Sequence, residues 1–241
     1  MKHATSKLTF AATAGKGQVS VSAVLQQPVS FDACLVLAHG AGADMRHVHM
    51  QSIADALCDV NIATLRFNFP YMEAGGGRTN DIDVCTTTIR NAIACLKDNC
   101  DLRTGGAQPI PVLSGGHSFG GRMSSYFAAD EPQGLSGLVY FSFPLHPAGK
   151  PGTSRADHMY RITLPQLFLS GTRDKLADLT LLRELIGKMQ NASLHELDTA
   201  DHGFKVLKRK RDKVLNVYTE AAESVRRWLD GLPKVTSKLD L

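Results

Sequence analysis

The pentapeptide Gly116-His117-Ser118-Phe119-Gly120 places a serine between glycines, after the apolar run 110–113 and before a stretch with helical periodicity. A strand, a sharp turn and a helix in that order form a nucleophile elbow, which holds a serine oxygen clear of the backbone. Such a hydroxyl attacks a carbonyl carbon only when a neighbouring base removes its proton. Because glycine and serine are common residues, the pentapeptide alone is a weak signal. Its position between strand and helix makes Ser118 the candidate nucleophile.

A base for Ser118, and an acid that orients this base, are expected downstream. Proteins with this kind of elbow can carry the serine, the acid and the histidine in that order, on loops that follow later strands. Asp174 follows one apolar strand and is the candidate acid, and His202 follows the next and is the candidate base. His195 is less suitable because it lies within a strand pattern. Asp201 is less suitable as the acid because a sequence neighbour rarely folds back onto the imidazole.

Acyl transfer also needs backbone amides that stabilise the oxyanion of the tetrahedral intermediate, each worth about 3 kcal/mol. The amide of Phe119, directly after the serine, is one expected donor. The amide of Ala41, in the loop of small residues at 39–43, is the other. Residues of neighbouring loops are expected to shape the pocket around them: His39, Gly40, Asn68, Tyr71 and His146.

These residues require a sheet that brings several loops to one edge. From about residue 33 onward, apolar strands alternate with amphipathic helices, which predicts a mostly parallel sheet covered by helices on both faces, an α/β fold. The expected strands cover 34–38, 62–67, 110–113, 138–141, 166–169 and 194–197, and helical patterns occur at 50–58, 82–96, 179–189 and 218–232. Residues 7–10 and 18–25 alternate in character around Gly15-Lys16-Gly17, which predicts an antiparallel hairpin at one sheet edge.

The pattern favours one α/β domain over residues 1–241, with about eight strands. Fewer than thirty residues separate the strands at 138–141 and 166–169, which is too few for a separate cap domain. The helix at 82–96 is expected to turn its apolar stripe toward the sheet. That stripe consists of Ile82, Cys85, Ile89, Ala92 and Leu96.

Composition excludes several classes of protein. Hydrophobic residues make up 43% and charged residues 21%, which are values of a globular protein rather than a disordered one. The net charge of +4 is modest, and the basic run 208–211 has no interleaved aromatics, so it is interpreted as a solvated face without a nucleic-acid partner. No apolar window reaches membrane-spanning length, so no membrane contact is expected. The apolar stretch 8–14 is short and broken by threonines, which favours a strand over a signal peptide.

The five cysteines are odd in number, and four of them lie in apolar patterns. Buried free thiols in a reducing, cytoplasmic compartment fit this distribution. His47 and His49 form an H-x-H pair, but no nearby carboxylate or third histidine completes a metal site. No metal and no organic cofactor is expected. A small acyl ester is the expected substrate, and a protein partner stays open.

Six short motifs, in order along the chain, resemble one family. They are HGAGA at 39–43, RFNFPY at 66–71, GGHSFGGRM at 115–123, FPLHPAGKP at 143–151, SGTRD at 170–174 and DHGFK at 201–205. The chain beyond residue 30 resembles the small lid-less α/β-hydrolases of the dienelactone-hydrolase-like superfamily. More narrowly, it is similar to the poorly characterised branch that includes testis-expressed proteins and a subunit of a histone acetyltransferase complex. The resemblance implies the triad Ser118, Asp174 and His202, but dienelactone hydrolases carry cysteine at the elbow, so lactone chemistry is not implied.

The sequence therefore predicts a serine hydrolase that cleaves a carboxylic ester or thioester through an acyl-enzyme on Ser118. A peptidase or an acyltransferase would use the same residues. An alternative of a different class is a non-catalytic or weakly catalytic module that keeps this fold and works by binding a protein partner. The geometry of the triad separates the two classes, because an intact triad favours catalysis and a degenerate one favours the module.

Overall fold

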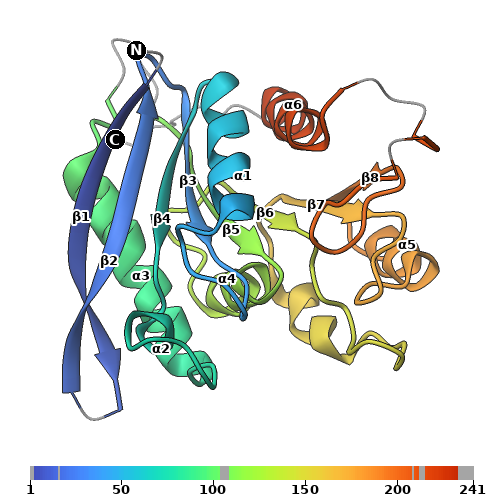
Figure 1. Ribbon diagram of the computed structural model, residues 1–241, viewed down its shortest axis with the longest axis horizontal. Coiled ribbons are helices and arrows are strands. Elements are labelled where there is room, and N and C mark those ends of the chain that lie inside the picture. Colours follow the sequence, from blue (N-terminus) through green and yellow to red (C-terminus); the bar gives the residue numbers. More distant parts are fainter. Residues whose placement is uncertain (1–2, 16, 104–108, 208, 212–214, 233–241) are drawn as a thin grey trace, which may run out of the picture.

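A computed structural model describes residues 3–15, 17–103, 109–207, 209–211 and 215–232. Eight strands form one sheet in the order β1-β2-β4-β3-β5-β6-β7-β8 (Figure 1). The strands are β1 (His3–Ala14), β2 (Gly17–Pro28), β3 (Ala33–Ala38), β4 (Ile62–Phe67), β5 (Val112–His117), β6 (Gly137–Phe141), β7 (Gln166–Gly171) and β8 (Ala192–Leu197). The helices are α1 (Val48–Asp59), α2 (Pro70–Glu73), α3 (Ile82–Asn99), α4 (Phe119–Asp130), the 3-10 helix η1 (Ser154–Arg161), α5 (Leu179–Gly187) and α6 (Val217–Asp230).

The order of the strands explains where a site can form. β3 lies between β4 and β5 and is parallel to both, and β6, β7 and β8 continue the parallel sheet. The chain first moves from β3 outward to β4 and then crosses back to β5 on the other side of β3. Loops that leave such a switch point diverge and open a crevice at the carboxyl ends of the strands. The loop after β3 carries Ala41 and the turn after β5 carries Ser118, so both lie at this crevice.

The hydrophobic core has two layers, one on each face of the sheet (Figure 1). Successive side chains of a strand point to opposite faces. Val36 therefore packs with the layer formed by α3, α4, α5 and η1, whereas Leu35 and Leu37 pack with α1 and α6. All five cysteines are buried and none forms a disulfide, as the sequence predicts. Among the described helices, none combines the length and the apolar character needed to cross a membrane.

The N-terminal hairpin is confirmed, and its strands are longer than predicted. β1 and β2 pair antiparallel from His3 opposite Pro28 to Ala14 opposite Gly17, and β2 is also antiparallel to β4. The first residues of both strands are exposed to solvent on both faces. Hydrophobic alternation marks a strand only where one face is buried, so the pattern missed the exposed start of β1, whereas the unpredicted last residues of β2 are buried or half-buried polar residues and a proline.

Two expectations about individual residues are wrong. β5 begins at Val112 rather than at residue 110. Pro111 has no amide proton, so it cannot donate a hydrogen bond to a neighbouring strand. Its carbonyl still accepts the Cys34 amide at 3.0 Å. Ile82 is 42% exposed rather than turned toward the sheet. It is the first residue of α3, where the helix projects past the sheet, and the buried stripe starts at Cys85.

Two glycines beside Ser118 are required by close backbone contacts. A Cβ atom on Gly116 would lie 2.2 Å from the carbonyl oxygen of Ala38, and one on Gly120 would lie 2.4 Å from the same oxygen. The end of β3 therefore packs directly against the backbone of β5 and of the first turn of α4. This contact brings the loop that follows Ala38 close to Ser118.

We expect Gly116→Ala to destabilise the fold by roughly 3 kcal/mol, because the new methyl group meets sheet backbone that cannot rotate away. Urea denaturation would measure the free energy of unfolding. Gly152→Ala is the matched control, since a Cβ atom on Gly152 meets nothing within 4 Å. Equal unfolding free energies for the two variants would contradict the backbone contact described above.

Candidate active site

Ser118 occupies a strained turn between β5 and α4. Its φ of 51° and ψ of −115° lie in a region that residues with a side chain rarely adopt. The Ser118 amide donates to the Phe141 carbonyl of β6 at 3.0 Å, and the Arg122 amide donates to the Ser118 carbonyl at 3.1 Å. The strained backbone is thus held from both sides, in the conformation expected of an elbow.

The structure brings Ser118, His202 and Asp174 into one hydrogen-bonded series. His202 Nε2 lies 2.8 Å from Ser118 Oγ, and His202 Nδ1 lies 2.9 Å and 2.8 Å from the two carboxylate oxygens of Asp174. The Asp174 side chain is fully buried, whereas that of His202 is 23% exposed. One Asp174 oxygen also accepts the Leu176 amide at 2.8 Å, which fixes the carboxylate. This arrangement can move a proton from the serine hydroxyl to an imidazole that keeps the opposite nitrogen protonated.

The two residues that the sequence disfavours lie elsewhere. Asp201 Oδ1 accepts the backbone amides of Gly203 and Lys205 at 3.0 Å and 2.9 Å, so this carboxylate closes its own loop. His195 lies in β8 and contacts Glu220 of α6 at 2.9 Å. Neither residue contacts Ser118 or the His202 ring.

His117 is a contributor that sequence reasoning missed. Its Nε2–H donates to the backbone carbonyl of His202 at 3.0 Å, and the rings of the two histidines lie 5.2 Å apart. A Cβ atom on Gly40 would lie 2.9 Å from His117 Nδ1, so the His117 ring fills the space between the loop after β3 and the histidine loop. The only signal for His117 in the sequence was its position directly before Ser118 in the pentapeptide of the elbow.

The loop after β3 lies directly beside the nucleophile. A Cβ atom on Gly40 would lie 3.7 Å from Ser118 Cβ. The Tyr71 hydroxyl donates to the Ala41 carbonyl at 3.0 Å and so orients the peptide units of this loop. Phe119 is the first residue of α4, and an amide at that position has no acceptor within its own helix. These positions suit the two predicted oxyanion donors, Phe119 and Ala41.

Three of the expected pocket residues position backbone instead. His39, Asn68 and His146 are 0%, 3% and 4% exposed. His39 donates from Nδ1 to the Gly40 carbonyl at 2.7 Å and accepts the Phe69 amide on Nε2 at 3.1 Å. Because both ring nitrogens are used, His39 links the loop after β3 to the start of α2.

Asn68 and His146 act in the same way. Asn68 Oδ1 accepts the Met45 amide at 3.0 Å, and His146 Nε2 accepts the Asp178 amide at 2.8 Å. His146 thereby ties the segment after β6 to the segment that carries Asp174. Polar side chains after strands can hydrogen-bond either to a substrate or to the backbone of neighbouring loops. Here they hydrogen-bond to the loops.

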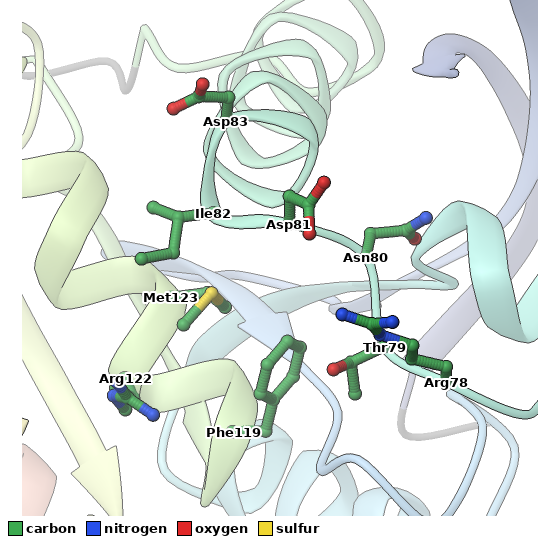
Figure 2. Close-up of a pocket in the computed structure, with 9 residues that line it drawn as sticks. All are labelled: Arg78, Thr79, Asn80, Asp81, Ile82, Asp83, Phe119, Arg122 and Met123. Carbon is green, nitrogen blue, oxygen red and sulfur yellow. The ribbon is translucent and has the colours of Figure 1, made fainter.

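A cleft of about 430 Å³, which the sequence did not predict, is lined by Phe119, the residue directly after Ser118 (Figure 2). Phe119 extends toward its centre from the start of α4, and Ile82 of α3 and Met123 of α4 add apolar side chains to the lining (Figure 2). Charged and polar side chains form the rest of the lining: Arg78, Thr79, Asn80, Asp81, Asp83 and Arg122. The exposed position of Ile82 places its side chain in this cleft. Within the described ranges, no group of three or more His, Cys, Asp and Glu residues could hold a metal ion.

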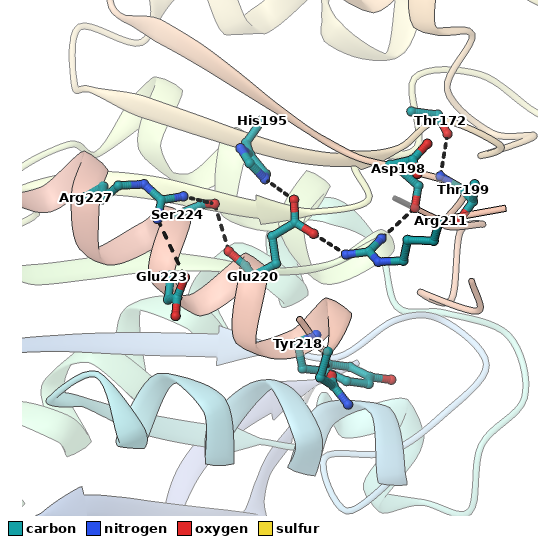
Figure 3. A network of polar contacts seen from close by, with 11 residues as sticks. Thr172, His195, Asp198, Thr199, Arg211, Tyr218, Glu220, Glu223, Ser224 and Arg227 are labelled. Carbon is teal, nitrogen blue, oxygen red and sulfur yellow. Dashed lines mark hydrogen bonds and ion pairs between the residues drawn. The ribbon is translucent and has the colours of Figure 1, made fainter. Parts of the chain in front are cut away.

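A buried ion pair anchors the loop that carries His202 (Figure 3). Arg211 forms an ion pair with Glu220 of α6 and donates to the Asp198 carbonyl at 2.6 Å. The Arg211 guanidinium therefore links the start of this loop, at Asp198, to α6. Only 4% of the Arg211 side chain is exposed, so the interpretation of 208–211 as a wholly solvated face is wrong at this position. Arg209 and Lys210 are exposed, and residue 208 lies outside the described residues.

Two buried histidines, His39 and His49, and the half-buried His117 are expected to make the fold sensitive to acid. Burial is the main cause that lowers the pKa of His39 to about 4, of His49 to about 3 and of His117 to about 4, from 6.5. Below pH 6.5 the unfolded chain takes up protons that the folded chain does not. Stability is therefore greatest above pH 6.5 and falls toward pH 4 by about 1.4 kcal/mol per pH unit for each histidine.

Urea denaturation at several pH values between 7 and 5 would test this expectation. His49→Phe should make the fall in unfolding free energy shallower by about 1.4 kcal/mol per pH unit, because one titrating group is removed. His3→Gln is the control, since His3 is exposed at the start of β1. A slope that His49→Phe leaves unchanged would show that His49 does not contribute.

Comparisons with known proteins identify the family and the fold. A family model described as alpha/beta hydrolase domain matches residues 31–230. The chain is similar to a lid-less α/β serine hydrolase from Xanthomonas campestris, with 20% sequence identity and a TM-score of 0.69 over 95% of this chain and 97% of that one. It is also similar to dienelactone hydrolase from Anabaena variabilis, with 18% identity and a TM-score of 0.67 over 94% and 97% of the two chains.

A third similar structure is Est1E from Butyrivibrio proteoclasticus with ferulic acid bound. It shares 18% identity and a TM-score of 0.65, over 88% of this chain and 96% of that one. At these identities the likeness concerns the fold. The eight-stranded, mostly parallel sheet with an antiparallel N-terminal hairpin is the fold that the sequence predicts.

Proposed function

Because the chain belongs to the alpha/beta hydrolase domain family, we propose that it is a serine hydrolase that cleaves a carboxylic ester or thioester through an acyl-enzyme on Ser118. The observation that carries this proposal is the hydrogen-bonded series from Asp174 through His202 to Ser118, with contacts of 2.8–2.9 Å. The strained φ of Ser118 is a second support, because a surface that only binds a partner has no use for a half-buried serine on a strained turn.

The proposed reaction has two halves. His202 Nε2 takes the proton of Ser118 Oγ while the oxygen attacks the carbonyl carbon, and the amides of Phe119 and Ala41 hold the resulting oxyanion. The protonated His202 then gives its proton to the leaving group. In the second half, His202 takes a proton from water, which attacks the acyl group and releases the acid. Asp174 keeps the proton of neutral His202 on Nδ1 and stabilises the imidazolium.

The cleft beside Phe119 is the proposed acyl site. Its volume of about 430 Å³ suits a small substrate, since ligand sites of small molecules begin at about 300 Å³. Phe119, Ile82 and Met123 offer apolar contacts, so a short or medium acyl chain fits their side of the cleft. In this proposal one domain carries the whole site, with no cap above it, and the leaving group stays near solvent.

The alternative functions predict different results. A peptidase or an acyltransferase would use the same three side chains and would differ only in the leaving group or the acceptor. A protein-interaction module would need no reactive serine at all. The intact hydrogen-bonded series favours the catalytic functions over the module.

A panel of p-nitrophenyl esters of increasing chain length, a feruloyl ester and an acyl thioester would test the proposal. The feruloyl ester is included because of the likeness to Est1E. We expect turnover to be fastest for short or medium acyl chains, and a fluorophosphonate probe to label Ser118, located by mass spectrometry. No turnover of any member, together with an unlabelled Ser118, would contradict catalysis and leave the interaction module.

A further inference from the structure

Two cysteine sulfurs lie side by side at the end of the sheet remote from the candidate active site. Cys34 Sγ of β3 and Cys100 Sγ, directly after α3, are 3.7 Å apart although 66 residues separate them along the chain. Cys34 is 0% exposed and Cys100 is 6% exposed. A disulfide needs the sulfurs at about 2.05 Å, a distance that small side-chain rotations must bridge.

The other three cysteines have different neighbours. The Cys85 thiol donates to the Asn80 carbonyl at 3.7 Å, and Cys95 Sγ accepts from the Asn99 amide at 3.9 Å. Cys58 lies on the opposite face of the sheet, in α1. Cys34 and Cys100 are therefore the pair with the geometry for a covalent link.

The surroundings of the pair distinguish the roles of its two sulfurs. With the negative charge on Cys100, the Cys34 thiol donates to the Cys100 sulfur, and Gln27 Nε2 donates to the same sulfur at 3.3 Å. The contact with Cys34, aided by Gln27, lowers the pKa of Cys100, while the contact with Cys100 and burial raise the pKa of Cys34. Because a thiolate is the reactive form of cysteine, Cys100 is the sulfur that reacts first.

A surface cavity lies on the side of this sulfur where Gln27 contacts it. Gln27, whose amide touches Cys100 Sγ, also lines a cavity of about 810 Å³ between the ends of the N-terminal hairpin. The remaining lining residues are His3, Ala4, Thr5, Pro28, Val29 and Phe31. Gln27 therefore both lines this cavity and contacts Cys100 Sγ.

We propose that Cys34 and Cys100 form a reversible disulfide when a hydroperoxide reaches Cys100. The Cys100 thiolate attacks the peroxide oxygen, which breaks the O–O bond and leaves a sulfenic acid on Cys100 and a hydroxide or alkoxide ion that takes up a proton. The Cys34 sulfur then attacks the Cys100 sulfur. Its proton joins the departing hydroxide as water, so two thiols are oxidised by one peroxide. A small thiol such as glutathione reverses the bond by thiol–disulfide exchange.

The bond is expected to stabilise the protein and to leave the proposed activity unchanged. Cys34 is four residues before the carboxyl end of β3, where the loop with Ala41 begins, so the link lies at the opposite end of the strand. It would close a loop of 66 residues, which restricts the unfolded chain. We expect the Tm to rise by about 10 °C.

Reduced protein treated with hydrogen peroxide, alkylated and digested without reductant would test the proposal. We expect one linked peptide that joins Cys34 to Cys100, an intact mass lower by two hydrogen atoms, a higher Tm, and full reversal by reductant. Cys100→Ala and Cys34→Ala should abolish the link and the shift in Tm, whereas Cys95→Ala should retain both. The identification of the linked peptide in the wild-type protein does not depend on whether any variant folds.

Several outcomes would overturn the proposal. These are the absence of a linked peptide, a link between other cysteines, or a sulfinic acid on Cys100 while Cys34 stays free. A linked peptide that appears only in protein with a lowered Tm would show that the thiols meet after unfolding. All these measurements are independent of ester turnover, so a failure of the proposed hydrolase function would not obscure them.

Discussion

Ser118→Ala is expected to lower kcat for any ester substrate by about a millionfold, because the reaction loses its nucleophile and His202 has no proton to take. Alanine meets the same backbone restriction as serine at a φ of 51°, so the free energy of unfolding should change little. Turnover of the best ester of the panel and urea denaturation would measure the two effects. Labelling by a fluorophosphonate probe should also disappear.

Ser154→Ala is the matched control for this experiment. Ser154 is an exposed serine at the start of η1, away from the elbow, and its loss should leave turnover and labelling unchanged. If Ser118→Ala retained more than a small fraction of the wild-type kcat, the acyl group would be carried by another residue. The acyl-enzyme proposal would then be abandoned.

Asp174→Asn is expected to lower kcat by about ten-thousandfold with little change in KM. An asparagine amide facing Nδ1 of His202 would donate a hydrogen bond and so move the imidazole proton to Nε2. The nitrogen that lies 2.8 Å from Ser118 Oγ could then no longer accept the serine proton. Steady-state kinetics with the best ester would separate kcat from KM, and a thermal melt would show whether the fold is retained.

Asp201→Asn provides the comparison that decides which acid orients His202. Asp201 Oδ1 accepts two backbone amides, and asparagine keeps an oxygen that can do the same. We therefore expect a loss of kcat of less than about tenfold. A larger loss for Asp201→Asn than for Asp174→Asn would assign the orienting role to Asp201.

The buried parallel strands could be predicted from the sequence because their signal is local. β3 and β4 are continuous apolar runs, and they lie within one residue of the predicted ranges 34–38 and 62–67. Their order in the sheet follows from general rules of α/β connections, which place the ends of parallel strands at one edge. For this reason three residues that are far apart in the sequence could be expected to meet. The predicted fold and the likeness to lid-less α/β-hydrolases are confirmed, and the narrower likeness to the testis-expressed branch stays a prediction.

The remainder of the site depends on contacts between elements that leave no local pattern. His117 supports His202 through a backbone carbonyl 85 residues away, and Arg211 reaches Asp198 and Glu220 only when the loop and α6 are folded. His39 and His146 stand at strand ends, where a polar residue can face either a substrate or a neighbouring amide. Sequence position does not distinguish these two orientations. The tertiary packing selects the second for both.

The backbone of Ser118 reveals a conflict between two requirements at one residue. Glycine adopts a positive φ without the steric penalty of a Cβ atom, so it would give this turn the least backbone strain. It would also remove the hydroxyl. The chain keeps a residue that is locally unfavourable, and the surrounding sheet, which holds the turn through Phe141 and Arg122, supplies the stability that the turn itself lacks. In the proposed function, the serine hydroxyl is thus kept at the expense of local folding energy.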